Sequence, residues 1–520
     1  MWVDGSQVEE RIEIVFTAGT WEDVSEDAFD YYQFDNGIRG GDILRRTATP
    51  GQFEFWLNNS ARNSAGLAGF YSPGHENVRE GFVKGAEVRI GYVYEGICYY
   101  KWRGTIEDIL PEPGFPGQRT RVVCKNFIRR LQNVMELPVM VTEKTAAEGV
   151  AEIIGKLAVS PAEMELGDCE TTYEAIFDVI KRDSSGLREI SRLMLGEMGW
   201  FYVKGNQRSG EVLTVQGRQT RAVKAIRQVP VGAARSGRLL LENGGYLLLE
   251  TGGRLVLDQV EALAAEPRGL APAGVSAVYN EVVVKVYPRR EDEDVVTLYE
   301  HPRPIELEPG AELAFSVAYA DPEQTAQSVT AASVVYPLVA GVDYGGNTAK
   351  DGSGDDVTEM VAVDVLPGVA AADVSLVNLD EENTVYVLPL KIRGKGRYAY
   401  QAVEVSARDD DSIAAHQRQR LEIDTAYLSE PATGKALAEA ILAVTKTPVS
   451  EFSIGYLAPL MSSQHFFGFL FLEPGERLRV EDETTGIDED YFVQHLTVVR
   501  TEQGDLNVTY TLLSERLSTI

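Results

Sequence analysis

Cysteine is scarce in this sequence and follows no pattern. The 520 residues include three cysteines, Cys98, Cys124 and Cys169, an odd number without C-x-x-C spacing. A disulfide framework needs an even set of cysteines, and a structural zinc site needs paired Cys or His ligands. We therefore expect free, buried thiols and no metal site.

Histidine is also rare, and the common catalytic motifs are missing. The sequence contains no nucleophile elbow, Walker loop, HExxH motif or dinucleotide fingerprint. His416 lies on a predicted helix, where a structural or solvated imidazole is favoured over a general base. The five histidines show no companion spacing and stand at His75, His301, His416, His465 and His495. We expect no enzymatic activity, no catalytic residues and no cofactor.

One acidic turn loosely resembles a calcium-binding loop. It runs over residues 351–356 and contains Asp351, Asp355 and Asp356. The turn lacks the glutamate twelve residues into that motif and the helix pair that flanks it. A solvated acidic turn is the favoured interpretation.

Positive charge and long apolar runs are both in short supply. There are 49 Lys and Arg against 79 Asp and Glu, a formal charge of −30, which argues against a surface that neutralises phosphates. The longest uncharged stretch, residues 324–342, is interrupted by polar residues and Pro337, so it does not predict a membrane span. The N-terminus also lacks the features of a secretory signal. We expect a soluble protein that is not exported and does not bind nucleic acid tightly.

What the sequence does contain is strand pattern and turns, with 48 Gly and 23 Tyr. Alternating segments predict hairpin strands, and the apolar spacing after them predicts a short helix over 127–135. We assign these elements to a first domain, residues 1–137. The predicted strands cover residues 52–57, 87–94, 99–109 and 119–125.

A small α+β domain is predicted over residues 138–220. Thr145 and Glu148 form a capping box before a helix of about three turns. A second Thr-x-x-Glu pattern at 171–174 predicts another helix start, and apolar spacing over 187–194 predicts a further helix. A hairpin over 200–215 completes the domain.

Residues 221–275 form a leucine-glycine ribbon and linker. A repeat of period eight covers residues 238–258, with paired glycines suited to tight turns. Two interpretations remain open: a hairpin packed on its own chain, or an element completed by neighbouring copies.

The remaining sequence predicts a terminal domain with an insertion. Strands over 279–287 and 401–406 flank a region of strands and turns without helical periodicity. This pattern predicts a β-sandwich over residues 300–395, inserted in a second domain that comprises residues 276–299 and 396–520.

Within the terminal domain, an N-cap at 409–412 predicts a helix through Leu421, and apolar spacing predicts another helix over 437–444. Strands are predicted over 451–456, 477–480, 491–499 and 506–513. The apolar run 465–472 predicts a strand buried on both faces, with an exposed partner-contacting or membrane-contacting tip as the alternative.

Several short motifs, taken in order, resemble the hub or tail-tip proteins of tailed bacteriophages and related injection machines, above all those of long-tailed phages. The first domain carries a strand ending in Asn, a Tyr-Ser-Pro loop, a G-x-x-V-R-I strand and a G-x-I strand. The ribbon and an Asp-Asp-Ser-Ile-Ala segment follow, and the resemblance spans most of the chain. The motifs lie at 48–59, 69–74, 84–90, 102–106, 238–258, 410–418, 437–448 and 491–493.

The resemblance implies a fold that is mainly β with α+β parts and has several domains. In addition to the α+β domain and the sandwich, it implies that the first and last domains are tube-like β-barrels. Three chains would then form a ring of six barrels that matches a six-fold tail tube. Some relatives carry a cell-wall hydrolase, and we expect none here.

The implied function is a structural hub that joins the tail tube to the tip and provides or closes the DNA exit channel. The implied partners are two further copies of the chain, the ring of distal tail or tail tube proteins, the tape measure protein, tip or fibre proteins, and the host envelope. DNA would pass without tight binding. The implied location is the virion, assembled in the host cytoplasm. The alternative function is a carbohydrate-binding or carbohydrate-acting surface protein, with Tyr99, Tyr100 and Trp102 as contact residues.

The acidic composition leads to one further expectation. A trimer of this chain carries a formal charge of −90, and a DNA channel that does not hold its cargo should have a net negative wall. A wall formed by Arg45, Arg46, Arg129 and Arg130 would contradict this expectation.

Overall fold

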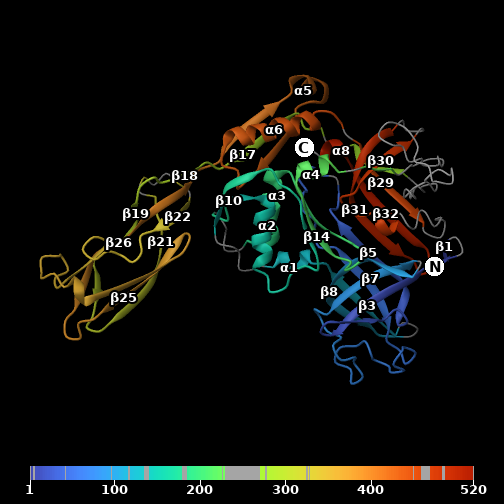
Figure 1. Cartoon of the computed structure of the whole chain (residues 1–520), viewed down its shortest axis with the longest axis horizontal. Coiled ribbons are helices and arrows are strands. Elements are labelled where there is room, and N and C mark those ends of the chain that lie inside the picture. The colour runs from blue at the N-terminus through green and yellow to red at the C-terminus, as the bar shows by residue number, and fades with distance from the viewer. Residues whose placement is uncertain are drawn as a thin grey trace, which may run out of the picture.

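The computed structural model describes residues 2–3, 6–40, 42–94, 96–114, 118–133, 140–178, 184–224, 226–228, 270–275, 278–321, 323, 326, 328–448, 450–457, 469–482 and 487–518. The leucine-glycine repeat at 238–258 and residues 465–468 lie outside this range. The described chain is mainly β, with several sheets in a body from which an elongated arm extends (Figure 1). No described helix is long and apolar enough to cross a membrane.

The strands expected in the first domain are confirmed. Phe53, Phe55 and Leu57 stand at alternate positions and are fully buried, which explains why this segment forms a strand with one face on the core. The helix after these strands is α1 (Ile128–Gln132). The strands are β1 (Trp2–Val3), β2 (Ser6–Gln7), β3 (Glu9–Thr17), β4 (Thr20–Asp23), β5 (Ala28–Gly37), β6 (Gln52–Asn58), β7 (Glu87–Tyr94), β8 (Ile97–Glu112) and β9 (Arg119–Lys125).

Strands from both ends of the chain join one sheet. Its order is β16-β29-β32-β31-β5-β6-β9-β8-β7-β3-β4, with β30 paired to β31 and β15 paired to β30. In Figure 1 the blue N-terminal strands and the red C-terminal strands therefore lie side by side. The strands of this sheet that come later in the chain are β15 (Ile226–Gln228), β16 (Leu270–Val275), β29 (Ser450–Leu457), β30 (Arg477–Asp482), β31 (Ile487–Arg500) and β32 (Leu506–Ser514), and helix α8 (Glu515–Ser518) follows them.

This arrangement corrects the expectation of two separate barrels. Among the described strands no barrel closes, because the strand order runs from β16 to β4 without a pairing between its two ends. The two strand sets are instead linked, because β5 pairs with β31. The two sets also share one hydrophobic core, which draws residues from 8–124 and from 469–512. The ring of Phe469 lies 5.2 Å from that of Tyr92, and the ring of Phe471 lies 5.3 Å from that of Tyr99.

The α+β unit contains the predicted capping box. Thr145 accepts a hydrogen bond from the Glu148 amide, and the Glu148 carboxylate accepts one from the Thr145 amide, at the start of α2. The expected hairpin forms between β13 and β14. The elements are β10 (Val141–Thr145), α2 (Ala146–Gly155), β11 (Met164–Leu166), β12 (Thr172–Ile176), α3 (Gly186–Glu197), β13 (Trp200–Lys204), β14 (Val212–Gln216) and α4 (Arg218–Ala222).

The helix start predicted at 171–174 is wrong. This segment is strand β12, which pairs with β10. Tyr173 is buried and donates a hydrogen bond from its hydroxyl to the Leu193 carbonyl, and the Thr171 amide donates to the Glu197 carboxylate. Contacts with α3 therefore outweigh a local capping pattern.

A third unit combines sheet β27-β17-β28 with helix α6. The helix predicted from 409 to 421 is shorter than expected, because Gln417 has a positive φ of 63° and Arg420 begins a strand. Asn280 holds this bend by donating from its side chain to the Gln417 carbonyl and accepting from the Gln419 amide. The elements are β17 (Glu281–Val286), β27 (Val403–Arg408), α5 (Asp410–His416), β28 (Arg420–Asp424) and α6 (Pro431–Thr445).

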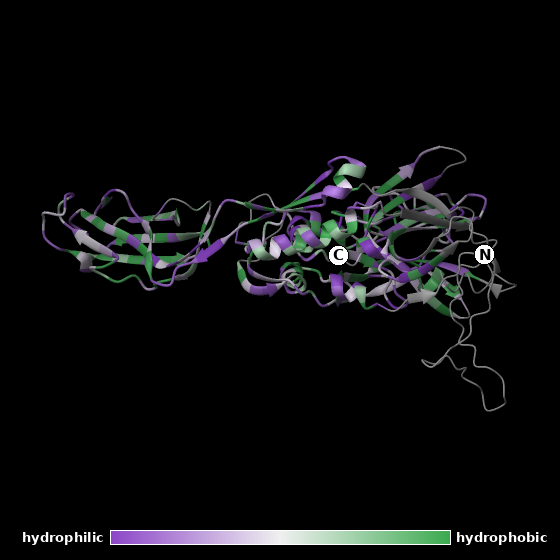
Figure 2. Ribbon diagram, turned by 90° about the horizontal axis from the view of Figure 1, so that it is seen from above, coloured by the Kyte–Doolittle hydropathy of each residue, from purple (hydrophilic) through white to green (hydrophobic). Residues whose placement is uncertain are grey.

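The arm lies between β17 and β27, which pair with each other. Its two sheets enclose a separate hydrophobic core with residues from 298–392, and it extends away from the body in both views (Figures 1 and 2). β18 and β19 pair with β26, so the paired arm strands begin at 289, not at 300. The elements are β18 (Arg289–Glu291), β19 (Val296–Glu300), β20 (Ile305–Leu307), β21 (Glu312–Ala318), β22 (Ser328–Val334), β23 (Tyr344–Asn347), the 3-10 helix η1 (Thr358–Met360), β24 (Val361–Pro367), β25 (Ala371–Asn378) and β26 (Val385–Ala399).

Candidate functional site

The candidate functional site is the seam where β5, from the first part of the chain, pairs with β31, from the last. Residues 32–37 pair antiparallel with residues 495–500. Gly37 closes the seam with φ of 95°, and a Cβ at this position would lie 2.2 Å from the Gln494 carbonyl oxygen. Only glycine fits here, because the backbone approach leaves no room for a side chain and the φ disfavours one.

A polar cluster centred on Asp35 crosses this seam. Its carboxylate accepts hydrogen bonds from Arg39, at 3.2 and 2.7 Å, and lies 3.1 Å from Nε2 of His495. The backbone N–H of Gln52 also donates to the Asp35 carboxylate, at 3.2 Å. Thr497 Oγ1 lies 3.3 Å from Nδ1 of His495. Burial raises the pKa of Asp35, but the hydrogen bonds and charges of His495 and Arg39 outweigh burial, so the net shift is downward.

A cavity of about 400 Å³ opens beside this cluster. It is lined by residues of β5, β6 and β31 and by Arg39, which follows β5: Gln33, Phe34, Asp35, Arg39, Gln52, His495 and Thr497. The Asp-His-Thr contacts have the connectivity of a nucleophile relay. However, His495 and Thr497 are two residues apart on one strand, so the strand geometry alone places them side by side. We assign the cluster to the stability of the seam.

A buried lysine provides a second connection between the two ends of the chain. Lys101 of β8 donates to the Phe469 carbonyl at 2.8 Å, and to the Leu470 and Leu472 carbonyls at 3.4 Å each. It also pairs with Glu473, which accepts a hydrogen bond from the Gly205 amide. Burial lowers the pKa of Lys101, whereas Glu473 acts in the opposite direction.

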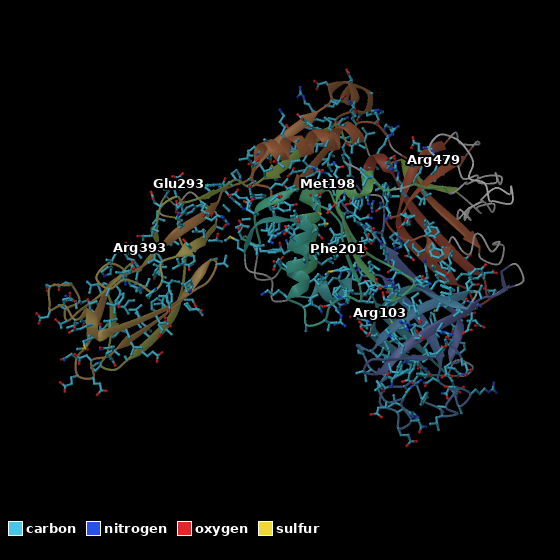
Figure 3. All side chains as sticks on the ribbon, in the orientation of Figure 1. Arg103, Met198, Phe201, Glu293, Arg393 and Arg479 are labelled. Atoms are coloured by element: carbon cyan, nitrogen blue, oxygen red, sulfur yellow. The ribbon has the colours of Figure 1, made fainter. Side chains whose placement is uncertain are left out.

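Trp200 connects the α+β unit to helix α8 at the C-terminal end of the described chain. The guanidinium carbons of Arg46 and Arg221 lie 4.1 and 4.0 Å from the centre of its ring. Its indole N–H donates to the carbonyl of Ser518, the last described residue. The side chain of Arg46 donates to the carbonyls of Ile43, Met198 and Leu517, so one buried cation ties together three distant segments. Figure 3 places Met198 and Phe201 in the middle of the body, far from Glu293 and Arg393 on the arm.

The residues considered for chemistry are not brought together. His416 is exposed at the end of α5. Asp351 accepts from Ser353, and Asp356 accepts from Thr358, so each caps its own turn. Among the described residues no group of three or more acidic, His or Cys side chains could hold a metal.

The aromatic residues considered for carbohydrate contact are unsuited to it. Tyr99 and Trp102 are buried in the core, and the guanidinium carbon of Arg89 covers Tyr100 at 3.8 Å from its ring centre. Of the cysteines, Cys124 is buried, and Cys98 and Cys169 are partly buried; all three are free.

Sequence reasoning missed Asp35, Lys101 and Trp200. The sequence does single out Lys101, because it is the one charged residue within the apolar segment 97–102. Strand alternation places its side chain on the buried face. A lysine on the buried face of a strand requires a buried partner.

Neither a protein-family model nor a curated protein sequence matches the chain. Among solved structures, the chain is similar to the 43 kDa tail protein of prophage MuSo2 from Shewanella oneidensis, with 9% identity and a TM-score of 0.44 over 98% of this chain and 99% of that chain. It is similar to the tail protein from Neisseria meningitidis MC58, with 8% identity and a TM-score of 0.45 over 99% and 98%. It is also similar to the prophage tail protein gp18 from Listeria monocytogenes EGD-e, with 8% identity and a TM-score of 0.39 over 97% and 94%. All three of these structures are tail proteins.

Proposed function

We propose that this chain is a structural hub of a phage tail tip or baseplate. Three copies form a ring that joins the tail tube to tip or fibre proteins and provides or closes the DNA exit channel. Its partners are the distal tail or tail tube ring and the tape measure protein, and its location is the virion. The role is structural and not catalytic.

One observation carries this proposal: each chain presents two strand sets, β3–β9 and β29–β32, side by side in one sheet with a shared core. Three such chains offer six strand sets, the number that a six-fold tube requires. Because both sets belong to one chain, the junction at β5 and β31 is preserved in every copy of the ring.

The outer strands of the sheet offer a means of ring closure. β4 and β16 end the strand order, and each pairs with one strand among those described. An edge strand presents unpaired backbone groups to a neighbour. Directly after β4, the backbone amide of Val24 donates to the Ile12 carbonyl, and strand alternation then directs the backbone N–H and C=O of Asp23 away from β3.

Sedimentation equilibrium and negative-stain microscopy test the proposal. We expect three times the chain mass of 57.2 kDa and ring-shaped particles. Asp23→Pro, which removes an outward N–H, should reduce the trimer fraction, whereas Asp23→Ala should not. A stable monomer at micromolar concentration, with no larger species in tail particles, would contradict the proposal.

A further inference from the structure

The arm contains an open sheet edge at β21. The sheet order is β21-β25-β24, and all seven residues of β21 pair with β25 in unbroken register. Among the described strands, β25 is the only partner of β21. One side of this strand is therefore available for pairing.

The hydrogen-bond pattern shows which backbone groups are available. The backbone N–H of Asn378 donates to the Ala311 carbonyl. Strand alternation then directs the backbone N–H and C=O groups of Leu313, Phe315 and Val317 toward β25. The N–H and C=O groups of the intervening residues point away from the sheet, and the backbone hydrogen bonds of the described chain leave them without partners. These residues are Glu312, Ala314, Ser316 and Ala318.

The side chains at this edge leave room for another strand. Ala314, Ser316 and Ala318 are small and exposed. Leu313, on the core-facing side, is 39% exposed, and Phe315 is only partly buried, so an added strand would cover apolar surface. β21 also lacks the proline, lysine and bulge that commonly protect an edge.

The charge around this edge selects the kind of partner. Residues 304–390 contain 15 Asp or Glu, with Lys350 as their only Lys or Arg. Glu308, Glu312 and Asp373 are exposed on or beside β21. Pairing with the same edge of a second copy would bring like charges together, whereas a basic strand would be attracted.

We propose that β21 is a docking edge for an extended segment of another protein that is rich in Lys or Arg. The segment adds as a fourth strand to sheet β21-β25-β24: backbone hydrogen bonds supply affinity, and the acidic surface supplies selectivity. This inference goes beyond the hub role and does not rest on it.

The experiment uses the full chain and three synthetic octapeptides, each acetylated and amidated. The probe alternates Lys and Val, the charge control alternates Lys and Pro, and the opposite-charge control alternates Glu and Val. Isothermal titration measures the affinity of each. Ala314→Pro removes an outward N–H without breaking the β25 ladder, and Ala314→Val is the matched variant that keeps it.

We expect the Lys-Val peptide to bind, and the Lys-Pro peptide to bind about tenfold more weakly or worse. Ala314→Pro should weaken Lys-Val binding by about tenfold, while Ala314→Val retains it. If Ala314→Pro unfolds the arm, the pair Glu312→Lys and Asp373→Lys tests the same edge, and should weaken Lys-Val binding and strengthen Glu-Val binding.

Three results would overturn the inference. The first is equal binding of both Lys peptides to wild type and Ala314→Pro, which would show attraction by charge alone. The second is no Lys-Val binding at millimolar concentration. The third is self-association of wild type that Ala314→Pro abolishes, which would make a second copy the occupant.

Discussion

Arg289 and Asp178 form a buried, two-point ion pair that joins the first strand of the arm to the α+β unit. Nε and one terminal nitrogen of Arg289 lie 2.6 and 3.0 Å from the two carboxylate oxygens of Asp178. Arg289 also donates to the carbonyls of Tyr287 and Ala426. The direction of the arm therefore depends on a contact between segments 111 residues apart.

Asp178→Asn should loosen the arm and destabilise the protein. The substitution leaves the Arg289 charge buried without its counter-ion, which costs about 3 kcal/mol. Urea unfolding should report this loss, and small-angle X-ray scattering should show a broader distance distribution. Glu300→Gln, which breaks the exposed pair with Lys391, should cost under about 1 kcal/mol. Equal behaviour of the two variants would contradict this role.

Gly37→Ala should destabilise the seam far more than Gly19→Ala. Both glycines have positive φ, 95° and 83°, but only Gly37 has backbone within reach of a new Cβ. Gly19→Ala should cost about 1 kcal/mol for the backbone conformation alone, and Gly37→Ala should cost at least about 3 kcal/mol. Chemical unfolding of both variants measures the difference, and similar costs would show that the close approach at Gly37 relaxes.

Asp35→Asn should remove a pH-dependent contribution to stability. Because the folded-state pKa of Asp35 lies below its ordinary value of 3.8, its contribution is complete above that value and is lost as pH falls through the folded-state pKa. The variant should be less stable by about 2 kcal/mol at pH 7, and the deficit should shrink as the pH falls below 3.8. Asp30→Asn, on the same strand and exposed, is the matched control. A deficit that stays constant as the pH falls well below 3.8 would contradict this account.

Deletion of residues 293–395 should leave the body folded. The Asp292 amide donates to the Gly396 carbonyl, so an Asn-Gly turn between these two residues should close a hairpin of β18 and the end of β26. The deletion retains Arg289, and the arm has its own core. Circular dichroism and a cooperative unfolding transition check the outcome. Aggregation of the shortened chain would show that the arm supports the body.

The protein should not bind duplex DNA measurably at about 0.15 M salt, where non-specific binders reach Kd values of about 10⁻⁴ to 10⁻⁶ M. Arg46 is buried against Trp200, and Arg129 pairs with Glu107, so neither is free to hold phosphates.

Deletion of 293–395 removes 18 acidic and five basic residues and changes the formal charge from −30 to −17. Fluorescence anisotropy should show no binding by either form. Micromolar binding by the full chain would contradict the expectation of a non-binding DNA channel, and binding by the shortened form alone would assign the repulsion of DNA to the arm.

The strands of the first domain were predictable from sequence because apolar residues recur at every second position, as Phe53, Phe55 and Leu57 do on the core-facing side of β6. The pairing of β5 with β31 was not predictable, because alternation of apolar residues identifies a strand but not the strand with which it pairs. Asp35 and His495 are 460 positions apart, and a contact at that separation leaves no local periodicity. The capping pattern at 171–174 was misleading for a related reason: Tyr173 packs against α3, and tertiary contacts override local propensity.

The seam has a consequence for the order of synthesis. A ribosome completes β5 more than 450 residues before His495 emerges, so the edge of β5 and part of the shared core stay uncovered until β31 has been synthesised. A product that ends early lacks β31 and β32 and exposes both the edge and the apolar surface, which are features that promote aggregation and proteolysis. The fold thus makes synthesis through β32 a condition for a complete sheet.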